Sequence, residues 1–87
     1  MSGSQHYADS AIAPSRAPFA ITPSDTERLP VATKAIYVGT GGAVVLRGVD
    51  GAADVTYRNV PAGSYLVVCA SHVRASGTTA AELVGEA

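Results

Sequence analysis

The sequence predicts an all-β protein, a small antiparallel β-sandwich or barrel of six to seven short strands, with an extended N-terminal arm. Two observations favour this fold class. Short runs rich in Val, Ile, Tyr and Thr recur between turns containing Gly, Pro, Asp or Asn, about every 8 to 12 residues. No interval between these turns has room for a helix of about 12 residues, the length that supports itself. We therefore expect an arm over residues 1–17 and a single β domain over residues 18–87.

The charge composition excludes several classes of function. The 87 residues include six basic and seven acidic side chains, a formal net charge of −1, so the chain lacks the basic surface that nucleic acids and anionic membranes attract.

The N-terminal residues have neither the basic nor the apolar segment of a secretory signal. No apolar run approaches the roughly 20 residues that cross a bilayer. We expect no nucleic-acid partner, no membrane and assembly in the cytoplasm.

A domain of this size has a small core and often needs a second source of stability. The single cysteine, Cys69, cannot form an internal disulfide, and no Cys/His cluster offers a structural zinc site. Oligomerisation remains, so we expect a homo-oligomer.

The arm is rich in Ser, Ala, Gly and Pro, and Pro14 and Pro18 interrupt any continuous helix. One interpretation is a disordered tail, as is common at termini of small domains. The other is an arm that orders on a partner. Its natural anchors are its large side chains and the first one after it: Tyr7, Ile12, Arg16 and Phe19.

The first expected strand covers residues 19–22 and ends at Pro23, where a turn begins. Ser24 or Asp25 can cap a single helical turn there. A full helix is excluded by Pro30.

Residues 35–38 and 43–47 are β-branched and apolar, and both predict buried strands. The Gly-rich stretch 39–42 joins them and predicts a hairpin turn. A phosphate-binding loop is the alternative, but it requires Gly-Lys-Ser/Thr at the start of a helix, and this loop leads into a strand.

Residues 55–60 alternate apolar and polar side chains, which predicts a strand with one solvated face. Residues 72–75 alternate as well, with Val73 inward and His72 and Arg74 outward. The final segment, 80–84, has helical propensity but is too short for a self-supporting helix, so we favour a last strand that completes a sheet.

The turn at residues 61–63 leads into the most apolar run of the chain, residues 65–70, which predicts a central strand. Both faces of this strand are apolar, because side chains alternate between them: Leu66, Val68 and Ala70 on one face, and Tyr65, Val67 and Cys69 on the other. A strand of this kind is covered on both sides. We expect the first face to pack in the domain and Tyr65 and Val67 to contact a neighbouring subunit.

The candidate catalytic and metal-binding residues are better explained by structural roles. Ser71 and His72 are expected on opposite faces of a strand, and no motif supplies a third group to orient the imidazole. Asp25, Asp50 and Asp54 lack the spacing of a calcium loop and are better explained as turn residues. Cys69 is expected to act as a small hydrophobic side chain. We therefore expect no catalytic residues, no metal, no cofactor and no enzymatic activity.

Five short blocks in a fixed order carry a resemblance to a known family. They are residues 20–26 (AITPSDT), 29–30 (LP), 35–39 (AIYVG), 59–64 (NVPAGS) and 75–80 (ASGTTA). In this order the chain resembles the head-spike base proteins of gene transfer agents and related tailed phages.

The resemblance implies a non-enzymatic structural protein of a virion or gene transfer agent particle, assembled in the bacterial cytoplasm. It implies a homo-oligomer, a pentamer, on capsid vertices. It also implies the major capsid protein as one partner and a spike fibre protein, which serves host attachment, as another. Tyr7, Ile12, Arg16 and Phe19 would then hold the arm to the capsid. The alternative from the residues is a small carbohydrate- or receptor-binding β-module that acts through the turns around Thr40 and Ser76.

Overall fold

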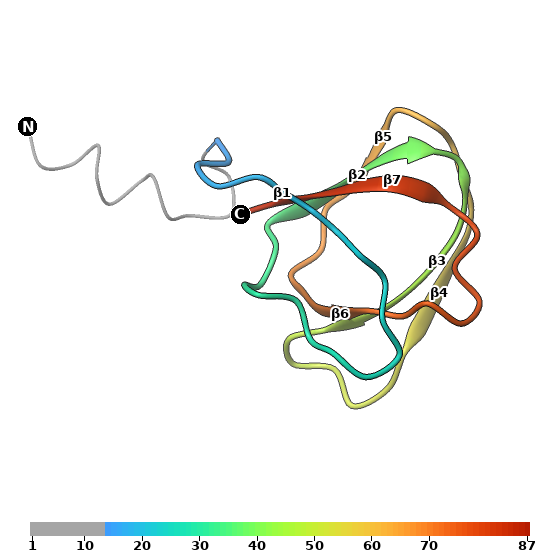
Figure 1. Ribbon diagram of the computed structural model, residues 1–87, viewed down its shortest axis with the longest axis horizontal. Coiled ribbons are helices and arrows are strands. Elements are labelled where there is room, and N and C mark those ends of the chain that lie inside the picture. Colours follow the sequence, from blue (N-terminus) through green and yellow to red (C-terminus); the bar gives the residue numbers. More distant parts are fainter. Residues whose placement is uncertain (1–13) are drawn as a thin grey trace, which may run out of the picture.

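The computed structural model describes residues 14–87 and is all-β over that range, as predicted (Figure 1). Two of the expected arm anchors, Tyr7 and Ile12, lie outside the described residues. The described part contains seven strands: β1 (Phe19–Ala20), β2 (Ala35–Thr40), β3 (Gly42–Gly48), β4 (Val55–Val60), β5 (Ser64–Leu66), β6 (Ala70–Val73) and β7 (Ala81–Glu86). It contains no helix, and therefore none that could span a membrane.

The strands form two antiparallel sheets. The larger sheet has the order β1-β7-β2-β5, and the smaller has the order β4-β3-β6. Branched aliphatic side chains from both sheets form the core, as alternation along each strand requires. The fully buried members are Ile36 and Val38 of β2, Val44 and Leu46 of β3, and Val73 of β6.

The predicted hairpin at residues 39–42 is wrong. β2 pairs with β5 and β7, whereas β3 pairs with β4 and β6, so the glycines turn the chain from one sheet into the other. The physical reason is close backbone approach. A Cβ at Gly41 would lie 2.8 Å from the carbonyl oxygen of Val60, and a Cβ at Gly42 would lie 2.7 Å from the amide nitrogen of Ala80. Only glycine permits these approaches.

The predicted central strand at residues 65–70 is instead divided between the sheets. β5 is an edge strand of the larger sheet, and β6 is an edge strand of the smaller sheet. Thr33 stabilises the crossover, since its hydroxyl donates to the Val68 carbonyl (2.8 Å) and accepts from the Ala70 amide (3.0 Å).

The C-terminal segment is a strand, as favoured from its sequence. β7 lies in the middle of the larger sheet, between β1 and β2 (Figure 1). Leu83 faces the core from this strand.

Candidate interaction surface

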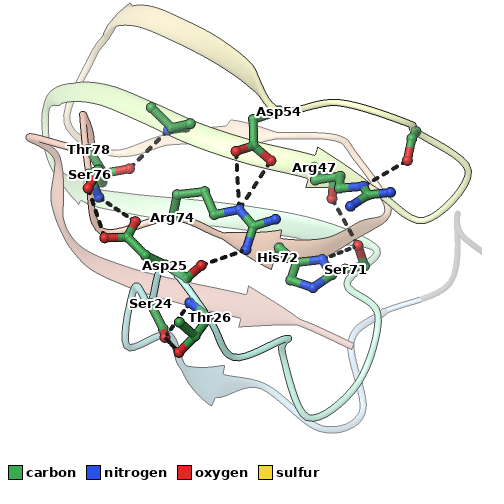
Figure 2. A network of polar contacts seen from close by, with 12 residues as sticks. Ser24, Asp25, Thr26, Arg47, Asp54, Ser71, His72, Arg74, Ser76 and Thr78 are labelled. Atoms are coloured by element: carbon green, nitrogen blue, oxygen red, sulfur yellow. Dashed lines mark hydrogen bonds and ion pairs between the residues drawn. The ribbon is translucent and has the colours of Figure 1, made fainter.

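A polar network closes one side of the sandwich and is centred on Arg74 (Figure 2). The Arg74 Nε lies 3.1 and 3.2 Å from the two carboxylate oxygens of Asp54, and the guanidinium also donates to the carbonyl oxygen of Asp25 (3.2 Å). The Asp25 carboxylate accepts from both the amide (2.9 Å) and the hydroxyl (2.8 Å) of Ser76. The network therefore joins three loops that are distant in the sequence.

The segment that carries Asp25 also covers the outer edge of β6. Amides of Ser24, Leu29 and Thr33 donate to the carbonyl oxygens of Val73, Ser71 and Ala70. The Ser24 hydroxyl accepts from the amides of Thr26 (3.2 Å) and Glu27 (3.0 Å), which is the predicted cap of a single turn. This side of the smaller sheet has no free strand edge.

The hydrogen bonds at the Asp25 carboxylate stabilise its charged form. The Ser76 amide and then the Ser76 hydroxyl lower the pKa of Asp25 below its ordinary value of 3.8, and the charge of Arg74 acts in the same direction. These turn-forming contacts agree with the interpretation of Asp25 as a turn residue. No group of three metal-ligating side chains occurs within residues 14–87.

Ser71 and His72 are closer than their positions on a strand predicted. The Ser71 Oγ lies 2.7 Å from the His72 Nδ1, because the ring of a half-buried histidine turns back along β6 toward its neighbour. The Ser71 hydroxyl also lies 3.4 Å from the Arg47 carbonyl oxygen. Sequence reasoning missed this contact, because strand alternation describes where Cβ atoms point and not where a long ring ends.

The Ser71–His72 pair lacks the other parts of a catalytic triad. No carboxylate within residues 14–87 accepts a hydrogen bond from His72, whose only hydrogen-bond partner in that range is Ser71. Partial burial, followed by the charges of Arg74, Arg28 and Arg47, lowers the pKa of His72 below 6.5. Burial and the three arginines outweigh the opposing charge of Asp54, so the surroundings of His72 disfavour the imidazolium that general-base catalysis forms. The pair is better explained as part of the structure.

The opposite side of the sandwich exposes apolar side chains. After β4, the turn at residues 61–63 carries the chain from the edge of one sheet to the edge of the other. Tyr65 is 59 % exposed, and Val67 is 83 % exposed. Cys69, which alternation placed on the same face as Tyr65 and Val67, is exposed as well. Leu66 and Val68, which alternate with these residues, pack against the core.

The side chain of Tyr65 packs against the side chain of Tyr37. Its ring meets the ring of Tyr37 on the neighbouring strand edge to face, with centroids 5.2 Å apart and planes at 63°. Such a pair contributes about 0.5–1.5 kcal/mol beyond its buried area. The exposed face of Tyr65 is therefore presented in one orientation, which suits a contact surface.

The structure places the two described arm anchors differently from each other. Arg16 is exposed, and its amide donates to the carbonyl oxygen of Ala87 (2.8 Å). Phe19 is partly buried on β1, where its ring lies over Gly85. Arg16 and Phe19 thus both lie beside the C-terminal end of β7.

Comparison with known proteins relates the chain to a solved capsid structure. No protein-family model matches the sequence, and no curated protein matches it. Among solved structures, the chain is similar to a chain of one described as "Capsid of native GTA particle computed with C5 symmetry". The two share 41 % sequence identity with a TM-score of 0.80, and the match covers 98 % of each chain. The similarity thus extends over both sheets and both sides of the sandwich.

Proposed function

Since this chain belongs to the family of the protein that it matches in the capsid of the native GTA particle, we propose that it is a head-spike base of such a particle. It is a structural component of a gene transfer agent particle. As a head-spike base, it forms a homo-oligomer on the capsid vertices, contacts the major capsid protein and supports a fibre that serves host attachment.

The observation that carries the proposal is identity of 41 % over nearly the whole of both chains. At this level over a full domain, the two proteins share the fold. The matched protein is a component of a capsid, which supports a non-enzymatic role.

Two features support the homo-oligomer. Tyr65 and Val67 are two exposed apolar side chains two residues apart. Exposed apolar patches on soluble proteins often mark protein–protein contact surfaces. The related particle was computed with C5 symmetry, which favours five copies around each axis. Arg16 and Phe19 lie at or just before β1, at the opposite edge of the larger sheet from β5, and are our candidates for the capsid contact, together with Tyr7 and Ile12.

Electron cryomicroscopy of particles from a strain that lacks this gene tests the proposal. We expect intact heads without spikes, and we expect purified protein to restore density at the five-fold vertices when it is added back. Spikes that persist in the deletion strain, or restored density at the tail, would contradict the assignment. A small receptor-binding module that acts alone would instead leave the spikes and bind glycans as the isolated domain.

A further inference from the structure

The smaller sheet has an apolar inner face that its own domain leaves uncovered. Val55 and Tyr57 of β4 pair with Leu46 and Val44 of β3. Cross-strand partners point to the same side of a sheet. Because Leu46 and Val44 are buried in the core, Val55 and Tyr57 also point to the core side. Nevertheless Val55 is 54 % exposed and Tyr57 is 37 % exposed.

β5, the edge strand of the larger sheet on this side, is too short to cover the six residues of β4. It has three residues, and only Ser64 and Leu66 of these point inward, opposite Val38 and Ile36. Sequence alternation predicted one solvated face for residues 55–60, whereas residues 55–59 are exposed on both faces.

Both strands on this side also have a free backbone edge. β4 pairs only with β3, and β5 pairs only with β2. Apart from the turn bond in which the Ser64 amide donates to the Pro61 carbonyl (3.3 Å), no backbone hydrogen bond outside these strand pairs joins β4 or β5 to any of residues 14–87. A free edge beside an uncovered apolar face invites an added strand.

At the other end of the larger sheet, β1 is an edge strand as well. The Ile21 amide donates to the Leu83 carbonyl (2.9 Å), and hydrogen bonding alternates along a strand. The amide and carbonyl groups of Ala20, one residue earlier, therefore point away from β7. Ala20 is exposed.

We propose that β1 of a second copy of this chain adds to the free edge of β5 and covers Val55 and Tyr57 of β4. The contact rests on the proposed function, in which the chain forms a ring, and it identifies the surfaces that meet. It joins two different surfaces, so it repeats around a closed ring and does not end at a dimer.

The strand directions agree with this contact. Neighbouring strands are antiparallel throughout β1-β7-β2-β5, so β5 runs opposite to β1. In a ring whose axis lies along the strands, the β1 of the next copy has the direction of the first copy's β1. Each junction between copies is then antiparallel, like every other pair in the sheet, because the sheet has an even number of strands.

Two substitutions in the full chain separate the two sides of the contact. Val55→Asp places a charge on the uncovered face, and Thr56→Asp, its matched control, places the same charge on the opposite face of the same strand. Ala20→Pro removes the outward amide of β1, a change that an edge strand accepts. By mass photometry we expect Val55→Asp and Ala20→Pro to weaken self-association at least about tenfold, while Thr56→Asp assembles as the wild type does. Circular dichroism confirms that each variant is folded.

Mixing the two defective variants gives the decisive result. Val55→Asp keeps a functional β1, and Ala20→Pro keeps a functional β4–β5 side, so we expect the mixture to form one-to-one dimers and nothing larger. A mixture that stays monomeric, or either variant assembling like Thr56→Asp, overturns the inference. In those cases the proposed function still holds if the wild-type chain forms a ring and restores density at the capsid vertices. A wild-type chain that neither self-associates nor restores vertex density would instead remove the proposed function itself.

Discussion

At Gly39 the neighbouring strand leaves no room for a Cβ atom. Gly39 lies opposite Glu82 where β2 and β7 pair, and Glu82 has a positive φ of 55°. A Cβ at position 39 would lie 2.7 Å from the Glu82 Cβ and 2.8 Å from its carbonyl oxygen. Real Cβ atoms do not approach this closely, so the two strands must separate to admit a methyl group.

We therefore expect Gly39→Ala to lower the free energy of unfolding by about 1–3 kcal/mol, as strained core substitutions do. Urea denaturation followed by circular dichroism measures the change. Gly48→Ala is the matched control, since a Cβ there meets only the Cys69 carbonyl oxygen, at 3.7 Å. Equal effects of the two substitutions would show that the approach to Glu82 is not the cause.

Asp25 makes stability depend on pH in a definite direction. Its pKa is lowered in the folded chain, chiefly by the Ser76 amide, so its charged form stabilises the fold above pH 3.8. This contribution is lost as the pH falls below 3.8 and through the lowered pKa. We expect Asp25→Asn to be less stable than the wild type at pH 6. The difference should shrink below about pH 3.8.

Urea unfolding at a series of pH values measures the difference. Asp50→Asn, which removes a carboxylate outside this network, controls for net charge. A gap between wild type and Asp25→Asn that stays constant down to pH 2.5, about one unit below the ordinary value, would refute the role of the charge.

At the scale of the element, the positions of strands could be predicted from the sequence but their partners could not. Residues 55–60 predicted a strand because alternation and turn residues are local properties, and residues 80–84 were favoured as a strand because they are too few for a self-supporting helix. Whether residues 39–42 form a hairpin or a corner between sheets depends on the backbones of Val60 and Ala80, which pack against the glycines only in the folded chain. The division of residues 65–70 between β5 and β6 could not be predicted either, because both faces of this run are apolar.

The interaction surface was predictable in part. Alternation along residues 65–70 placed Tyr65 and Val67 away from the core, and both are exposed. The uncovered face of β4 was not predictable, since it arises from the shortness of β5, three residues against the six of β4. Nor was the Arg74 network, whose members come from three separate loops.

Thr33 is the residue on which the division between β5 and β6 depends. It is 2 % exposed, and its hydroxyl satisfies two backbone groups at the crossover. Valine has the same shape but would leave the Val68 carbonyl and the Ala70 amide without a partner. We expect Thr33→Val to cost about 2–4 kcal/mol of unfolding free energy.

Chemical denaturation measures this cost, with Thr40→Val as the control. The Thr40 hydroxyl donates to the Glu82 carboxylate at an exposed position, so its loss should change stability by less than about 0.5 kcal/mol. A neutral Thr33→Val variant would mean that water replaces the hydroxyl at the crossover.

At the scale of the whole molecule, the sandwich has one closed side and one open side. Hydrogen bonds of residues 24–33 close the β6 edge, whereas β4 and β5 leave theirs free. This asymmetry separates stability from assembly. Substitutions on the closed side should unfold the chain, and substitutions on the open side should separate its copies.

Val67→Asp tests this separation. Because Val67 is 83 % exposed, we expect a charge there to abolish assembly while the β structure and the melting temperature of the monomer are kept. Light scattering and circular dichroism measure the two properties. Val49→Asp introduces the same charge at an exposed valine elsewhere and should leave assembly intact. Unfolding of Val67→Asp, with any folded remainder still oligomeric, would mean that residue 67 serves only the domain.

The exposed thiol of Cys69 allows the copies of this chain on a particle to be counted by fluorescence labelling. Cys69 is the only cysteine in the chain, so a maleimide fluorophore attaches once per copy. Purified protein labelled in this way and added back to spikeless heads would report its copy number through the number of photobleaching steps at each vertex. The same dye lies two residues from Val67, where its emission would also record the moment at which neighbouring copies meet.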